Sequence, residues 1–181
     1  GAGLRVVDNL LKPDLVAPGN RIVGAAATQA SSTVPTWNTL ATLFGSVLVT
    51  PLGITPVYPE TQMLMSGTSI AAPAVAGTVA LMLQANPGLT PPLVKAILQY
   101  SAQPTADGNL LQQGAGMLNI SGAMALATAL RTDIATAVEA GTLAPGANLL
   151  AAGKSMPAPS STIGGSTVNW SGMVFAGGNR V

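Results

Sequence analysis

One stretch of the sequence limits the possible folds more than any other. Residues 69–85 form an almost uninterrupted helical pattern of Ala, Val, Leu and Met that carries no charge. Asn86, Pro87 and Gly88 then stop the helix. Ala and Gly make this helix thin, so it can lie deep between other elements, and a helix that is apolar all round is buried on every side. We therefore expect burial of all its faces.

The same stretch does not predict a membrane span. Its uncharged apolar part covers residues 70–83 and contains Pro73, Gly77 and Thr78. A spanning helix needs about 20 apolar residues, and a shorter one is more often a core helix. Residues 41–57 are also apolar but are interrupted by Gly and Pro. We expect no membrane partner.

Shorter elements surround the long helix. Residues 15–17 and 21–26 are compact apolar runs that predict two buried strands. A long surface excursion is predicted over residues 28–60, which are rich in Thr, Ser and Pro. Thr90 followed by Pro91 predicts the start of a second helix.

Further helices are predicted over residues 121–130 and 132–140, after a Gly-rich turn at 113–116. Beyond residue 140 the chain is dominated by Gly, Ala, Ser, Pro and Asn, which predicts loop and edge strand.

The charges and the missing residue types exclude several functions. Only 7% of the 181 residues are charged and the net charge is +1, which excludes a nucleic-acid footprint and a polybasic membrane patch. The chain has no Cys and no His, so it cannot form disulfides or a zinc site built on these residues. It also lacks the usual proton carrier of neutral-pH catalysis. Alone, it cannot complete a Ser-His-Asp triad.

Ser69 is the strongest candidate for chemistry, because it lies where a strand-like approach meets the start of the long helix. Backbone N–H groups there have no partner, and the helix dipole adds partial positive charge. Such donors suit a developing oxyanion, at about 2.7–4 kcal/mol each. Gly67 allows a substrate to approach the backbone closely. A serine at this place in isolation is more often only a helix cap.

Two longer motifs favour the catalytic interpretation. Residues 67–73 read GTSIAAP and residues 75–77 read VAG, while residues 12–19 read KPDLVAPG. Together they resemble the nucleophile motif and the preceding segment of subtilisin-like serine proteases, the subtilases. The resemblance covers about residues 12–125.

The resemblance implies an α/β fold with three layers, in which a mainly parallel sheet is flanked by helices. Residues 1–130 would be the C-terminal part of the catalytic domain, and residues 131–181 a C-terminal helix with a Gly/Ala/Ser/Pro-rich extension. Ser69 would be the acyl-forming nucleophile and its own N–H an oxyanion donor, with Thr68 and Gly67 supporting the oxyanion hole or the substrate.

The departures from the family pattern concern the other catalytic groups. The Asp and His of the family, and the Asn that completes the oxyanion hole, all lie upstream of the KPD segment. Asn9 is too close to Lys12 to replace that Asn. The chain starts with Gly rather than Met, and we expect that it was cut from a longer precursor. The missing half would be an N-terminal part or a second chain, without which only about 10³- to 10⁴-fold catalysis over water remains.

No cofactor is evident from the residues, and calcium is implied by the family resemblance alone. Asp14 and Asp107 are isolated carboxylates, and no cluster specifies calcium or another metal. We expect Asp14 to pair locally within its turn. Sedolisins, acid-active relatives, are disfavoured because they carry an acidic calcium loop near the C-terminus. Between residue 114 and the end only Asp133 and Glu139 are acidic.

The resemblance therefore predicts part of a secreted serine endopeptidase that hydrolyses polypeptide substrates through an acyl-enzyme on Ser69. The Ala-rich, Cys-free composition suits an exported enzyme. The alternative is a catalytically inactive structural or binding chain that retains the subtilase core. The intact Gly67–Thr68–Ser69 string argues against this alternative.

Overall fold

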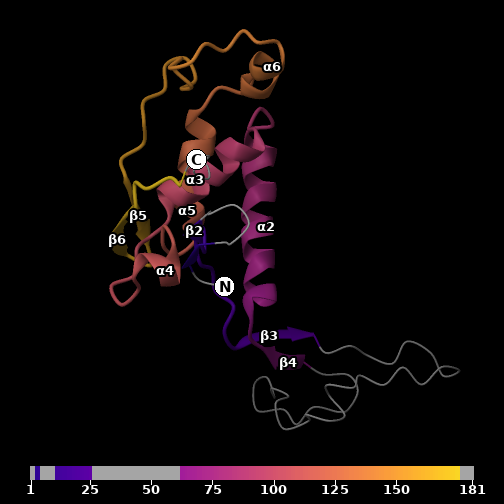
Figure 1. Ribbon diagram of the computed structural model, residues 1–181, viewed down its shortest axis with the longest axis vertical. Coiled ribbons are helices and arrows are strands. Elements are labelled where there is room, and N and C mark those ends of the chain that lie inside the picture. Colours follow the sequence, from indigo (N-terminus) through magenta and orange to yellow (C-terminus); the bar gives the residue numbers. More distant parts are fainter. Residues whose placement is uncertain (1–2, 5–10, 26–61, 176–181) are drawn as a thin grey trace, which may run out of the picture. The chain divides into compact units, whose positions relative to one another are not determined.

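The computed structural model describes residues 3–4, 11–25 and 62–175 (Figure 1). Its elements in chain order are β1 (Gly3–Leu4), β2 (Leu11–Lys12), β3 (Ile22–Ala25), β4 (Gln62–Met65), α2 (Thr68–Ala85), α3 (Pro91–Ser101), α4 (Leu110–Gln113), α5 (Ile120–Ala129), α6 (Ile134–Glu139), β5 (Ser160–Ile163) and β6 (Ser166–Asn169). The predicted excursion over residues 28–60 lies outside the described residues.

The chain divides into two compact units. The first, here the serine unit, is Pro18–Pro73, and the second, here the helical unit, combines Gly1–Ala17 with Ala74–Val181. Helix α2 begins in the serine unit and ends in the helical unit.

Helix α2 is confirmed, and it ends where the sequence predicts, immediately before Asn86. The Asn86 side chain is buried, and its Nδ2 donates to the carbonyl oxygens of Ala127 at 2.9 Å and Leu130 at 3.2 Å. Its Oδ1 accepts from the backbone N–H of Gly88 at 3.1 Å. The turn that stops α2 therefore also fastens its end to the end of α5.

The expected burial of α2 on every side is wrong for the part of the chain that the structure describes. Thr78 and Met82 are its only buried residues, while Leu81 is 46% exposed and Leu83 is 40% exposed. The helix is 18 residues long with a mean hydropathy of 1.4, so by length and composition alone it could cross a membrane. The described helices cover one stripe of α2, which leaves the rest of an apolar surface open.

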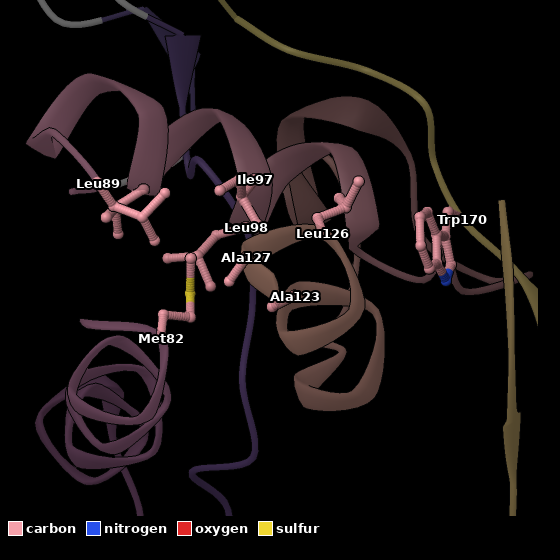
Figure 2. Close-up of a cluster of buried hydrophobic side chains, with 9 residues drawn as sticks. Met82, Leu89, Ile97, Leu98, Ala123, Leu126, Ala127 and Trp170 are labelled. Atoms are coloured by element: carbon pink, nitrogen blue, oxygen red, sulfur yellow. The ribbon is translucent and has the colours of Figure 1, made fainter. Parts of the chain in front are cut away.

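The core of the helical unit lies where α2, α3 and α5 meet. Figure 2 shows Met82 of α2 directed toward Leu98 of α3, with Ala123 and Ala127 of α5 beside them. Helix α3 begins directly after Thr90 with proline in its first turn, as predicted. Small residues on α5 allow the helices to approach closely, so a few large side chains fill the core.

The remaining predicted helices are also present, with slightly different bounds. Residues 121–130 were expected to be helical, and α5 covers Ile120–Ala129 after a cap in which the Asn119 side chain accepts from Gly122 N–H. The helix expected over residues 132–140 is α6, which is shorter.

Helices and strands both occur, as expected of the α/β class, but the described strand pairs are antiparallel. They are β1–β2, β3–β4 and β5–β6, and the parallel contact is an isolated bridge between Val16 and Met117. The mainly parallel sheet remains a prediction. Strand β3 lies where a buried strand was expected, yet Ile22 is 38% and Val23 46% exposed, because a two-stranded ribbon leaves its side chains accessible.

The segment after residue 140 is more ordered than loop and edge strand alone. Strands β5 and β6 form a hairpin, and Trp170 directly after it is only 7% exposed. Its Nε1–H donates to Ser161 Oγ at 2.8 Å, and Asn119 Nδ2 donates to the same oxygen at 3.1 Å. The indole also meets the Tyr100 ring edge to face, with the ring centroids 6.2 Å apart.

Candidate functional site

The structure places the three predicted site residues together in the turn between β4 and α2. We call residues 66–69 the serine turn. Thr68 and Ser69 open α2, and both side chains are exposed. The carbonyl oxygen of Gly67 accepts from Ile70 N–H at 3.1 Å and from Ala71 N–H at 3.2 Å, which closes the first turn.

This position gives Ser69 an exposed hydroxyl at the N-terminus of a long helix. The first N–H groups of a helix have no acceptor within the helix, and they carry the positive end of its dipole. Gly67 has φ of 150°, in the region that favours glycine. An oxyanion that forms on a carbonyl oxygen attacked by Ser69 Oγ would therefore meet N–H groups of the first turn, which is the arrangement that acyl transfer requires.

The second sequence motif braces the serine turn. Within the serine unit, Gly67 N–H donates to the carbonyl oxygen of Gly19 at 2.7 Å. A Cβ on Gly19 would lie 2.7 Å from Gly67 O and 2.8 Å from the Cβ of Ala71. Glycine is therefore required here, because a larger residue would push the two segments apart. The end of the KPDLVAPG motif thus touches the start of the GTSIAAP motif.

Asn20 and the backbone of Arg21 also hold the serine turn in place, and the sequence did not predict either contact. Ser66 Oγ accepts from the backbone N–H of Arg21 at 2.8 Å and donates to Asn20 Oδ1 at 3.0 Å. Arg21 and Asn20 lie 45 and 46 residues before Ser66 in the chain, so no local pattern links them. The available signal was the position of Asn20 directly after the Pro-Gly pair that precedes β3.

Asp14 is the centre of a charged cluster in the helical unit. It forms ion pairs with Lys12, as expected of local pairing, and with Lys95 at 2.8 Å. Partial burial raises the pKa of Asp14, but hydrogen bonds from Lys12 and Lys95 lower it further, so the pKa lies below its usual value. Asp14 is thus a paired carboxylate at neutral pH, unsuited to accept a proton.

Gln99 completes this cluster and was not predicted. Its side chain is fully buried, and Nε2 donates to Asp14 Oδ1 at 3.0 Å. A polar residue among the apolar positions of a predicted helix indicates a buried hydrogen-bond partner, and this signal was available in the sequence.

A cavity of about 440 Å³ lies beside this cluster, within the helical unit. Its lining is mainly aliphatic and includes Val75, Val79 and Leu83 of α2 with Val94 and Leu98 of α3. Such a lining favours contact with apolar side chains over binding of a polar reacting group. In the stretches 11–25 and 62–175, no three residues of the types His, Cys, Asp and Glu gather in a way that could hold a metal.

Comparisons with known proteins agree with the motifs. A sequence model described as "Subtilase family" matches residues 3–117. The chain is 37% identical over 94 residues to the subtilisin-like protease SBT2.3 of Arabidopsis thaliana, covering 52% of this chain and 9% of the plant protein. It is 32% identical over 108 residues to the serine protease AprX of Bacillus subtilis (strain 168), covering 60% of this chain and 21% of that protein.

Among solved structures, fervidolysin from Fervidobacterium pennivorans, a keratinolytic enzyme related to subtilisin, is 25% identical with a TM-score of 0.42. The match covers 59% of this chain and 14% of the fervidolysin chain. The chain therefore spans only a small part of each relative that it matches.

Proposed function

The chain belongs to the subtilase family, and from this premise we propose that it supplies the nucleophile half of a serine endopeptidase domain. The observation that carries the proposal is Ser69, exposed in the first turn of α2 within a motif that Gly19 braces. In the whole domain these residues would belong to three layers around a mainly parallel sheet, as the family resemblance implies.

The proposed reaction uses Ser69 as the attacking group. Its Oγ forms a bond to the scissile carbonyl carbon while its proton passes to a base, and the leaving amine takes that proton as the acyl-enzyme forms. Ser69 N–H stabilises the oxyanion, with Thr68 and Gly67 shaping the turn around it. Water then releases the acyl group.

The base and its Asp partner would come from the N-terminal part of the same protease, present upstream or as a second chain. Two observations support such a partner. The chain contains no His, and Leu81 and Leu83 leave an apolar face of α2 open beside the aliphatic cavity. Covering this face together with the other exposed apolar edges of the core would give an interface of the obligate class, of more than about 2,000 Å². Such a partner would also remove the apolar surface of α2 from water, so no membrane is needed to bury it.

The proposal includes secretion, polypeptide substrates and calcium. Secretion rests on the absence of cysteine and the Ala-rich composition, and calcium on the family resemblance alone. No part of the charge pattern favours nucleic acid as a partner.

Fluorophosphonate labelling followed by intact mass spectrometry tests the function. We expect one label in the full-length protein, located on Ser69 by peptide mapping, and none on the 181-residue chain alone, because that chain lacks the base. A label on another serine would contradict the assignment. Full-length protein that takes no label would support the inactive structural or binding chain instead.

Mild peroxide provides a second prediction, at the residue beside the nucleophile. Ile70 cannot be oxidised to a polar sulfoxide, whereas methionine at this position can. We expect the full-length protease to keep its hydrolytic activity after peroxide treatment and the Ile70→Met variant to lose most of it. Residual activity is measured with a peptide substrate. Equal loss in both proteins would contradict the prediction.

A further inference from the structure

We propose that Asn20 is a positioning residue for the nucleophile and that it acts through the Ser66 hydroxyl. The inference rests on the proposed function of Ser69. Asn20 is exposed and belongs to the loop before β3, whereas Ser66 begins the serine turn. Their hydrogen bond, with Ser66 Oγ donating to Asn20 Oδ1 at 3.0 Å, joins the two segments by side chains alone.

The geometry gives the Ser66 hydroxyl a single orientation. A serine hydroxyl has one proton to donate, and here Asn20 Oδ1 accepts it while the oxygen accepts from Arg21 N–H at 2.8 Å. Without the Asn20 oxygen, this proton would be donated to solvent, because Ser66 is exposed, and the hydroxyl would be free to rotate. Both side-chain links would then weaken together, while the Gly67–Gly19 hydrogen bond and the β3–β4 ladder, which ends at the Ile22–Met65 pair, would still join the segments.

The backbone at Arg21 indicates that this arrangement is held against strain. Arg21 has φ of 55°, in the left-handed region, where a residue with a side chain costs about 1–3 kcal/mol. In this conformation its N–H reaches Ser66 Oγ. Strain of this kind persists where surrounding contacts over-determine the backbone, and it is concentrated at functional sites.

The serine turn is where such a constraint affects the reaction. Ser69 is three residues after Ser66, and Gly67 between them has a backbone conformation that favours glycine. A displacement of 1 Å at a reacting group can lower a rate about 100-fold. Asn20 therefore restricts the motion of the turn that orients the Ser69 hydroxyl. Asn20 itself contacts neither the substrate nor the reacting atoms in this proposal.

The test is steady-state kinetics of the full-length protease with Asn20→Ala, Ser66→Ala and the double variant. We expect Asn20→Ala to lower kcat about 3- to 10-fold with KM unchanged, the size expected for loss of one hydrogen bond. Asn20→Asp keeps the acceptor oxygen and should restore kcat. In the Ser66→Ala background, Asn20→Ala should have no further effect, because the contact is already absent. Asn148→Ala is the matched control, since Asn148 is also exposed and its Oδ1 accepts one backbone N–H, from Leu150.

The outcomes separate this inference from the proposed function. If wild-type protein reacts with a fluorophosphonate but Asn20→Ala has an unchanged kcat, the inference alone is overturned. It is also overturned if the effects of Asn20→Ala and Ser66→Ala multiply, if KM changes instead of kcat, or if Asn20→Asp does not restore the rate. If the wild-type full-length protein does not react at Ser69, the proposed function fails and the inference fails with it.

Discussion

If the full-length protein is the proposed protease, replacing Ser69 with alanine is expected to lower kcat about 10⁶-fold, the magnitude found for loss of the nucleophile in subtilisin. The variant keeps the backbone N–H groups of the serine turn, so substrate should still bind and KM should change little. The remaining rate reflects oxyanion stabilisation and binding without an acyl-enzyme. The measurement is hydrolysis of a chromogenic peptide together with active-site titration.

A matched control uses Ser155→Ala, because Ser155 is an exposed serine in the segment after α6 and no role is assigned to it. This variant should hydrolyse the peptide at the wild-type rate. Retention of one part in ten or more of the activity by Ser69→Ala would place the nucleophile on another residue.

Replacing Trp170 with alanine is expected to lower the free energy of unfolding by about 3–5 kcal/mol, as for other large aromatic residues in a core. The indole is 7% exposed, and it packs so closely on α5 that a Cβ on Gly122 would lie 2.9 Å from its ring. Its removal would also take the indole N–H away from Ser161, a buried hydroxyl that would retain Asn119 as its partner. Urea unfolding of the full-length protein measures the effect.

Met156→Ala is the control for the Trp170 prediction, because Met156 precedes β5 in the same C-terminal segment and is 51% exposed. We expect its free energy of unfolding to change by less than about 0.5 kcal/mol. A loss below about 1 kcal/mol in Trp170→Ala would show that the segment after α6 contributes little to the fold.

Local signals allowed the helices to be predicted well. The end of α2 follows from the Asn-Pro-Gly turn and the start of α3 from Thr90 and Pro91, because helix stops and caps depend on neighbouring residues. The serine turn could likewise be predicted, because its residues belong to one continuous sequence motif. These features require no knowledge of the rest of the chain.

Contacts between distant segments could not be predicted in this way. Asn20 meets Ser66, and Trp170 meets Ser161 in a segment that was predicted as loop and edge strand, without a predicted contact to the core. The burial expected for α2 depends on what covers it, and the described residues cover only one stripe. Such contacts depend on tertiary packing, which propensity and periodicity do not encode.

Gln99 has a consequence for how far the helical unit can be shortened. Its buried carboxamide donates to Asp14 and accepts from the backbone N–H of Phe175 at 3.0 Å. One amide thus joins the start of the chain, α3 and a residue that lies well past position 117, where the family match stops. A chain cut at residue 117 would lack Phe175, so Gln99 Oε1 would lose its hydrogen-bond donor. Such a chain would also lack Trp170. We therefore expect the helical unit to lose contacts of its core when the chain is cut anywhere before Phe175.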